Sequence, residues 1–373
     1  MLVAVSTAQQ PVPDAAASVK PIEPPAKPLP PEAETANITR FSFIAYGDSR
    51  SGNEPGVPGD GQVLQVAHTR LMDVMLGKID ALSSTPFPVR FVVQSGDSVL
   101  RGANASQWNV SFTPIVERLT RRAGIPYFFA AGNHDVSGMP LGDPGRAAGL
   151  RNTLAANSKL IPPDGSPRRL SGYPTYAIGY GNVFMITLDS NIARDPVQRA
   201  WVADQLEHID HERYRHIVVV FHHPVYSSAR HGGGEFEPST ATIRDLYMPL
   251  FRRHHVRLLI VGHDHVFEHW IERYADTKND RQRLDEIVTG GGGAPVYEYV
   301  REPDLSAYVT SYASERVTVE HVAKPGPTTA ENPHHFVVMQ VDGDRLSLEV
   351  VSSGAALAPY NGRSRIDLSD RER

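Results

Sequence analysis

Five short apolar runs in this sequence each end in polar side chains, and this pattern constrains the fold more than any other feature. The runs are FSFIAYGD ending at Asp48, FVVQSGD at Asp97, YFFAAGNHD at Asp135, HIVVVFHHP with His222 and His223, and RLLIVGHDH with His263 and His265. Runs of this length and composition are typical of buried strands. The stretches 62–79 and 196–209 between them are typical of helices, the second with Asp195 as its cap. The sequence therefore predicts an α/β domain with a central sheet.

The polar clusters all lie at the carboxyl ends of the predicted strands. In open α/β sheets, ligands bind at this edge of the sheet. We therefore expect the five clusters to meet in one cleft, although they are spread along the chain from Asp48 to His265.

The composition excludes several classes of site and of partner. The chain has no cysteine, so disulfides, thiolate zinc sites and cysteine nucleophiles are excluded. A net charge of −5 gives no reason to expect nucleic acid or a membrane surface as a partner. No apolar run reaches the roughly 18 residues that a transmembrane helix needs. Any metal ion must be bound by nitrogen and oxygen ligands.

The chain divides into a long central domain with two flanking segments. Residues 1–38 are rich in proline and alanine and predict an extended, solvated tether. Its start, MLVAVSTAQQ, resembles a truncated signal peptide, which favours a periplasmic or secreted protein; a disordered start, in a cytoplasmic protein, is the alternative. Residues 39–355 form the predicted domain, with irregular insertions at 137–171 and 303–333, and 356–373 form a tail. Within the domain, Asp342-Gly343-Asp344 between two alternating runs predicts a β-hairpin.

The polar clusters together supply a set of metal ligands. Asp48 and Asp97 offer carboxylates, Asn133 an amide oxygen, and three histidines offer ring nitrogens: His222, His263 and His265. This mixture suits divalent ions such as Mn, Zn or Fe. Six protein ligands are too many for one open catalytic ion but suit two ions bridged by a carboxylate.

The ordered motifs identify a family resemblance. GD at 47–48, GD at 96–97, GNHD at 132–135, HHP at 222–224 and GHDH at 262–265 resemble the signature of the calcineurin-like metallophosphoesterases. The resemblance implies a two-sheet α/β/β/α sandwich and two divalent or mixed-valence transition metal ions. It implies that Asp97 bridges the ions, that Asn133, His222 and His263 complete one site, and that Asp48 and His265 serve the other. It also implies that His134 contacts the substrate and protonates the leaving oxygen.

Finer details resemble the purple acid phosphatase branch of that superfamily. His231 follows His222 by nine residues, where that branch has a substrate-facing histidine. Two positions depart from the pattern: Arg50 replaces a customary histidine, and Leu100 stands where the branch has a tyrosine ligand. The first metal site therefore needs another fourth ligand, such as Tyr46 or water. We expect Arg50 to bind a phosphate oxygen instead.

The resemblance implies hydrolysis of a small-molecule phosphate ester, most simply a phosphomonoester, by a hydroxide held between the two ions. A phosphodiesterase of the same superfamily is one alternative. A binding protein that keeps the fold without catalysis is another, favoured by the missing ligands at positions 50 and 100. We interpret His223 as a core or supporting histidine, and the four glycines from Gly290 to Gly293 as a tight turn near the cleft.

Overall fold

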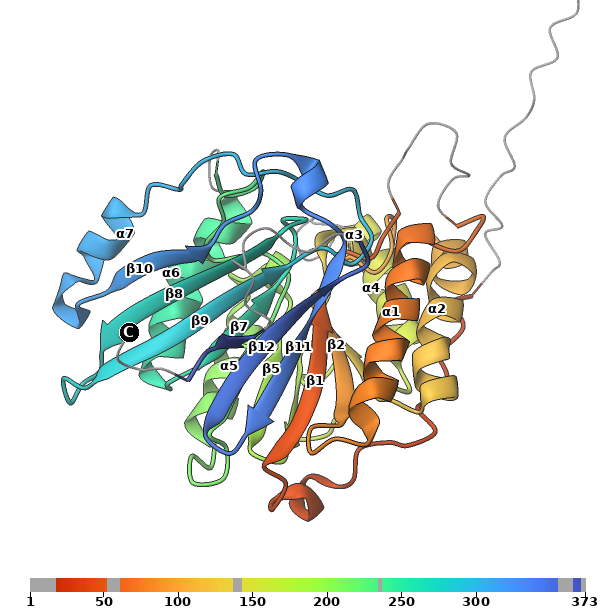
Figure 1. Cartoon of the computed structure of the whole chain (residues 1–373), viewed down its shortest axis with the longest axis horizontal. Helices are drawn as coiled ribbons and strands as arrows, with labels where there is room; N and C mark the ends of the chain where they lie inside the picture. The colour runs from red at the N-terminus through yellow and green to blue at the C-terminus, as the bar shows by residue number, and fades with distance from the viewer. Residues whose placement is uncertain (1–17, 52–60, 137–142, 234–236, 355–364, 370–373) are drawn as a thin grey trace, which may run out of the picture.

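The computed structural model describes residues 18–51, 61–136, 143–233, 237–354 and 365–369 (Figure 1). Two mixed sheets pack face to face, and helices cover their outer faces. The predicted two-sheet sandwich is confirmed. Within the described residues, no helix combines the length and the apolar character needed to cross a bilayer.

The first sheet carries three of the five predicted strands. Its order is β13 (Ile366–Asp367), β12 (Arg345–Ser352), β11 (His335–Asp342), β1 (Arg40–Tyr46), β2 (Val89–Gln94) and β3 (Tyr127–Phe129). The strands β1, β2 and β3 are parallel, so their carboxyl ends lie at one edge. The antiparallel pair β11 and β12 is the predicted hairpin, and Gly343 has the positive φ of 62° that its turn requires.

The second sheet carries the other two predicted strands. Its order is β10 (Thr318–Ala323), β8 (Phe267–Ala275), β9 (Arg281–Thr289), β7 (Leu258–Val261), β6 (His216–Val220), β5 (Val183–Thr187) and β4 (Tyr176–Tyr180). The four strands β5, β6, β7 and β9 are parallel. The histidine motifs therefore leave this sheet at the carboxyl ends of β6 and β7.

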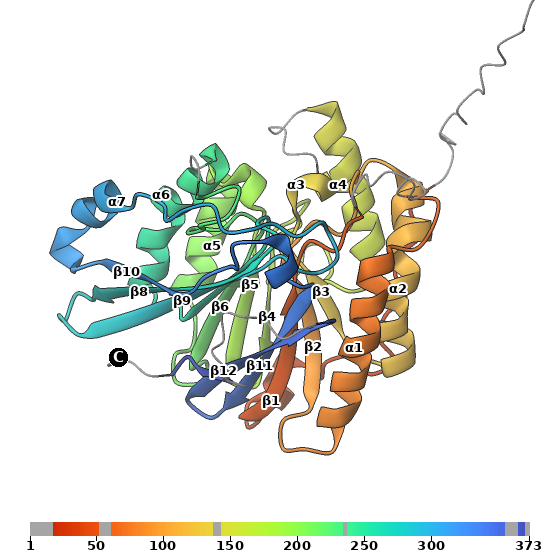
Figure 2. The same ribbon diagram turned by 45° about the horizontal axis from the view of Figure 1, so that its top comes forward.

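The helices lie on the two outer faces (Figures 1 and 2). Near the first sheet lie α1 (Val66–Ser83), α2 (Thr113–Glu117), α3 (Asn133–Val136) and α4 (Pro144–Asn157), and near the second lie α5 (Pro196–Glu207), α6 (Pro238–Arg253) and α7 (Ser306–Ser311). Asp195 caps α5 as predicted, because its Oδ1 accepts a hydrogen bond of 2.8 Å from the Gln198 amide. The helix α1 begins later than the predicted range 62–79.

The alternating side chains of β6 show how the layers are held together. Val218 and Val220 belong to the core between the two sheets, whereas Ile217 and Val219 belong to the core beneath the outer helices. Aromatic rings join the sheets directly: the ring centroids of Phe41 and Tyr180 are 5.0 Å apart. A strand buried on both faces explains why its sequence is uniformly apolar.

Three segments that were predicted to be irregular contain helices or strands. The insertion 137–171 contains the helix α4, although 137–142 lie outside the described residues. The insertion 303–333 contains α7 and the edge strand β10, which pairs with β8. The predicted C-terminal tail contributes β13, which pairs with β12. The strands β10 and β13 have weak apolar patterns and form by pairing to a neighbouring strand, whereas α4 begins at a local signal, the Asp143 cap before Pro144.

The predicted tether is wrong for residues 18–38. Ile22 is fully buried, and its amide donates to the carbonyl of Ala156 at 2.8 Å. The amide of Ala26 donates to the Thr120 carbonyl at 3.1 Å. Proline-rich chain is extended, and here the extended chain docks its few apolar side chains on the domain. The expected signal-peptide remnant lies in 1–17, outside the described residues.

Glu32 fastens this segment to the second sheet. It lies in a short 3₁₀ turn, η1 (Glu32–Thr35), and its carboxylate accepts from Arg168 at 2.7 and 3.1 Å and from the Tyr214 hydroxyl at 2.5 Å. Burial opposes ionisation, but the hydrogen bonds from Arg168 and Tyr214 leave the pKa of Glu32 lowered overall. The ionised form of Glu32 therefore stabilises the fold.

We predict that Glu32→Ala lowers the free energy of unfolding by about 1–2 kcal/mol at pH 7, because the Arg168 guanidinium and the Tyr214 hydroxyl lose their acceptor. A lowered folded-state pKa means that the stabilisation is present above pH 4.5 and is lost as the pH falls through the folded-state value. Urea unfolding across this pH range measures the difference. Glu34→Ala, an exposed neighbour in the same turn, is the control and should unfold like the wild type.

Candidate metal centre

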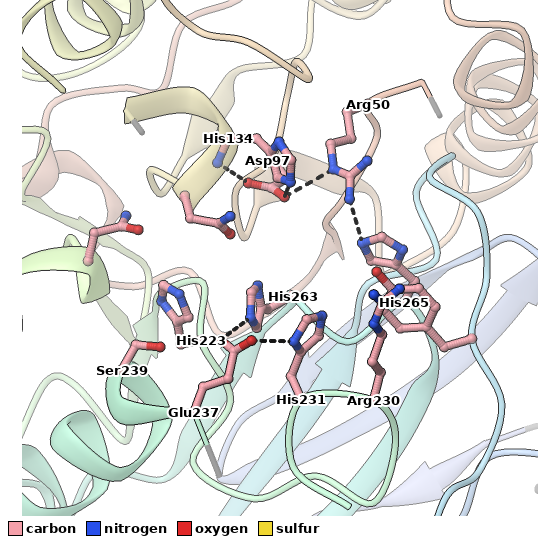
Figure 3. Close-up of a pocket in the computed structure, with 13 residues that line it drawn as sticks. Arg50, Asp97, His134, His223, Arg230, His231, Glu237, Ser239, His263 and His265 are labelled. Atoms are coloured by element: carbon pink, nitrogen blue, oxygen red, sulfur yellow. Dashed lines mark hydrogen bonds and ion pairs between the residues drawn. The ribbon is translucent and has the colours of Figure 1, made fainter. Parts of the chain in front are cut away.

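A cavity of about 420 Å³ opens where the carboxyl ends of both sheets meet (Figure 3). Polar side chains from all five predicted clusters reach this region. Its lining residues are Arg50, Asp97, Asn133, His134, Asn191, His223, Arg230, His231, Glu237, Ser239, His263, His265 and Tyr297. The predicted convergence of the strand ends in one cleft is confirmed.

Three of the predicted ligands have left-handed backbones. Asp48, Asp97 and His263 have φ of 58°, 56° and 68°, in a region that side-chain-bearing residues seldom adopt. Hydrogen bonds hold two of the turns: Asp48 Oδ2 accepts from the His263 amide at 2.9 Å, and Asp97 Oδ1 accepts from the His134 amide at 2.9 Å. Strain of about 1–3 kcal/mol for each residue is typical of functional sites.

Glycines beside these turns are required by close packing. A Cβ on Gly132 would lie 2.2 Å from Asp97 Oδ1, and one on Gly290 would lie 2.2 Å from the Asp264 carbonyl and 2.9 Å from Asp48 Oδ2. The second contact confirms that the glycine run is a turn packed beside the cleft. The glycines of the sequence motifs thus let the backbone approach the carboxylates.

One group of donors surrounds His222. Its Nε2 lies 2.9 Å from Asn133 Oδ1, 3.4 Å from Asp97 Oδ1 and 3.2 Å from His263 Nδ1. Its Nδ1 lies 3.0 Å from the carbonyl of Ser95. A carbonyl oxygen can only accept a hydrogen bond, so Nδ1 carries the proton. The lone pair of Nε2 therefore faces the other three donors, which is the arrangement that a shared cation requires.

A second group of donors contains Asp48 and His265. The His265 Nε2 lies 3.4 Å from Asp48 Oδ1, and its Nδ1 lies 2.6 Å from the carbonyl of Pro295. Among the described residues, Asp48 Oδ1 has no hydrogen-bond partner although it is buried. A buried oxygen without a donor, opposite an imidazole nitrogen that carries a lone pair, fits a metal ion.

The charges of the two groups point to the same conclusion. Burial, with the neighbouring charge of Asp97, raises the pKa of Asp48 to about 7. Burial and the Arg50 guanidinium lower the pKa of His265 to about 3, so its imidazole is neutral. Two buried carboxylates beside neutral histidines repel each other until cations neutralise them. The donor set fits two borderline divalent ions.

The two departures from the family pattern are resolved in part. Arg50 lines the cavity, with its Nε 3.3 Å from Asp97 Oδ2 and its Nη2 3.5 Å from His265 Nε2. Tyr46 does not supply a fourth ligand: it is fully buried, and its hydroxyl lies 3.1 Å from His68 Nε2. Leu100 offers its carbonyl to His134 Nδ1 at 2.8 Å.

The ring of Tyr297, which the sequence did not single out, stacks on His265 with centroids 4.1 Å apart.

The predicted substrate-facing histidines both line the cavity. His134 follows Asn133 at the start of α3, and its Nε2 lies 3.9 Å from Asp97 Oδ2. The ring centroid of His231 lies 4.1 Å from that of His263. His223 is buried, with its Nδ1 2.8 Å from Ser190 Oγ, and its supporting role stays a prediction, because ligand atoms of His223, Glu237 and His263 also lie within 4.8 Å of one another.

Sequence reasoning missed Glu237, which precedes α6. Its carboxylate spans two histidines: Oε1 lies 2.5 Å from His231 Nδ1, and Oε2 lies 2.9 Å from His263 Nε2 (Figure 3). His263 therefore presents Nδ1 to His222 and Nε2 to a carboxylate. A carboxylate behind a ligating histidine fixes the orientation of its ring and raises its basicity. No local pattern in the sequence marks this residue.

A family model described as calcineurin-like phosphoesterase matches residues 73–267, just over half of the chain. The matched stretch includes the predicted ligands from Asp97 to His265, whereas Asp48 and Arg50 precede it.

Solved structures share the fold. A purple acid phosphatase from yellow lupin (Lupinus luteus) seeds aligns with a TM-score of 0.62 and 18% identity, over 88% of this chain and 53% of the lupin chain. This chain thus spans about half the length of that protein. GAP50, the anchor in the inner membrane complex of Plasmodium, aligns with a TM-score of 0.50 and 16% identity, over 86% of this chain and 87% of its own. Identities this low establish a shared fold alone.

We predict that Glu237→Gln weakens metal binding about tenfold, because a carboxylate behind a ligating histidine contributes about 10- to 100-fold to affinity. Competition of the bound metal against a chelator of known affinity measures the change without reference to activity. Ser239→Ala, which alters another residue of the cavity wall, is the control. Equal affinities for Glu237→Gln and the wild type would contradict a role of Glu237 in orienting His263.

Proposed function

The chain belongs to the calcineurin-like phosphoesterase family and is a metal-dependent phosphoesterase, and we propose that it hydrolyses small phosphomonoesters at a pair of metal ions. The observation that carries the proposal is the meeting of Asp97, Asn133 and His263 around the His222 Nε2, because these residues come from four different strand ends.

The proposed ligands follow the two donor groups. Asp97 would be shared by the two ions, because its ligand oxygen lies within 4.8 Å of ligand atoms of both Asp48 and His222. The first group also holds Asn133 and His263, and the second holds Asp48 and His265. We propose Mn, Zn or Fe, the ions that suit mixed oxygen and imidazole ligands. Such a pair lowers the pKa of bound water and neutralises charge on phosphoryl oxygens.

The remaining polar groups of the cavity position the substrate. Arg50 reaches Asp97 through Nε at 3.3 Å and His265 through Nη2 at 3.5 Å, so Nη1 is the nitrogen left for a phosphate oxygen beside Asp97. His134 is anchored through Nδ1 to the Leu100 carbonyl, which directs Nε2 into the cavity. From that position His134 donates a proton to the leaving oxygen, and His231 contacts the phosphate from the opposite wall.

Charge favours monoesters over diesters. Arg50 and Arg230 bring two guanidinium groups to the cavity, and its two lining carboxylates, Asp97 and Glu237, are engaged with histidines. A phosphomonoester carries up to two negative charges and a diester one, so the cationic wall discriminates between them. Phosphodiester hydrolysis by the same site is the alternative.

A non-catalytic binding role is the second candidate. The departures at Arg50 and Leu100 remove two customary ligands of the first metal site. GAP50 has the same fold and is described as an anchor. In the second donor group only Asp48, Asp97 and His265 remain to hold an ion. If the protein binds a single ion, the binding role is favoured over catalysis.

We predict that the purified protein binds about two metal ions and that, loaded with Mn, Zn or Fe, it hydrolyses p-nitrophenyl phosphate faster than bis-p-nitrophenyl phosphate. Asp97→Asn should abolish hydrolysis and reduce metal content, because the bridging carboxylate loses its charge. Elemental analysis and both assays provide the readout. Asp164→Asn, on the exposed surface, is the matched control. Two bound ions without hydrolysis of either substrate would favour the binding role.

We predict that Arg50→Ala lowers kcat/KM for p-nitrophenyl phosphate by about 100-fold, the typical loss for a preorganised donor. Arg50→Lys should recover part of the loss, since lysine keeps the charge but not the planar fork. Metal content, measured in parallel, separates a role in substrate binding from support of Asp97. An unchanged kcat/KM in Arg50→Ala would rule out this role.

A further inference from the structure

Arg230 adds positive charge to the cavity, but the proposed reaction assigns it no direct contact with the phosphoryl group. It is exposed and lines the cavity, and its guanidinium lies 5.4 Å from the ring centroid of Tyr297. Within the ranges that the structure describes, no carboxylate forms an ion pair with it, whereas Arg50 contacts Asp97. A guanidinium in a cavity without an acidic partner is suited to an anion from solution.

The backbone around Arg230 is held rigidly. The His231 amide donates to Asp264 Oδ1 at 3.0 Å, and the Ser228 amide donates to Glu268 Oε1 at 3.1 Å. Both acceptors are fully buried. Residues on either side of Arg230 are therefore fixed to the sheet, although its own side chain is exposed. Such preorganisation lowers the entropic cost of binding an anion.

The side chain of Arg230 also has a defined surface to lie on. Its guanidinium faces the ring of Tyr297, and Tyr297 stacks on His265 with an angle of 17° between the rings. The Tyr297 ring thus contacts both the Arg230 guanidinium and the proposed ligand His265 along one wall of the cavity. Arg230 is therefore a cation beside the proposed metal ligands and is not one of them.

We propose that Arg230 binds a second anionic group, carried by the leaving group, so that the preferred substrates are phosphate esters or anhydrides with a further phosphate or carboxylate near the scissile bond. The inference rests on the proposed function, in which the metal ions and Arg50 take the phosphoryl group. Hydrolysis forms a bond between the oxygen of the attacking water and phosphorus and breaks the bond between phosphorus and the leaving oxygen, which takes up a proton from His134. Arg230 is a specificity-determining residue that forms no bond in this step.

Binding of substrate analogues tests the proposal without turnover. The probes are methylphosphonate, which has one anionic group, and two analogues with a second: methylenediphosphonate carries a phosphonate and phosphonoacetate a carboxylate. Calorimetry on the metal-loaded protein measures the dissociation constant of each analogue. Arg230→Ala should weaken the binding of the analogue whose second anionic group Arg230 contacts about tenfold or more, as expected for a lost charged hydrogen bond. The dissociation constant of methylphosphonate should change much less. The stronger of the two responses identifies the second group as phosphate or carboxylate.

Two further variants sharpen the comparison. Arg230→Lys keeps the charge and should recover part of the lost affinity. Arg281→Ala removes one exposed arginine at the start of β9 and controls for the change in net charge. Metal content is measured for every variant, because a diphosphonate also competes for metal ions.

Hydrolysis supplies the second readout. The ratio of kcat/KM for pyrophosphate to that for p-nitrophenyl phosphate should fall about tenfold in Arg230→Ala and stay constant in Arg281→Ala. Equal losses with all probes would overturn the proposal, since they would mark Arg230 as a general phosphate contact. Absence of hydrolysis in the metal-loaded wild type would contradict the proposed function, while the calorimetric comparison would still decide the role of Arg230.

Discussion

The burial of two carboxylates, Asp48 and Asp97, among neutral histidines is the constraint on which this structure depends. Isolated charges in such a position are costly, and the two residues also have strained backbones. The fold tolerates both costs because the surrounding amides and ring nitrogens leave positions beside the two carboxylates that cations can occupy. The same arrangement that would destabilise a protein without metal ions supplies candidate ligands for them, and the phosphoesterase family to which the chain belongs uses such ions.

The sandwich provides the geometry for this site. The first sheet delivers Asp48, Asp97 and Asn133, and the second delivers His222 and the pair His263 and His265. Neither sheet holds a complete set of ligands, so packing between the sheets also assembles the metal centre. The N-terminal segment strengthens this packing, because Ile22 docks beside α4 while Glu32 reaches Arg168 and Tyr214 near the second sheet. Stability and metal binding are thus coupled through one interface.

A layer of buried acids supports the residues around the ions. Glu286 accepts from the amides of Val225 and Tyr226 at 2.9 Å, and Glu268 holds the Ser228 amide. These bonds fix the loop that connects His222 to Arg230 and His231. Glu237 then links His231 to His263 across the cavity. The proposed metal ligands and the proposed substrate-facing residues are therefore positioned by one network, which favours precise placement over adaptability.

The sequence by itself determined the strands, their polar carboxyl ends, the hairpin at Gly343 and the cap at Asp195, because these features depend on local periodicity and turn chemistry. Those strand ends were enough to predict which six donors would meet. Only the tertiary structure decided the packing of residues 18–38, the pairing of β10 and β13, and the presence of Glu237, Tyr297 and Arg230 at the site. These residues lie in segments without a strong pattern, and their roles arise from contacts with partners distant in the chain. Local sequence patterns do not predict such contacts, because the contacts depend on how the two sheets pack.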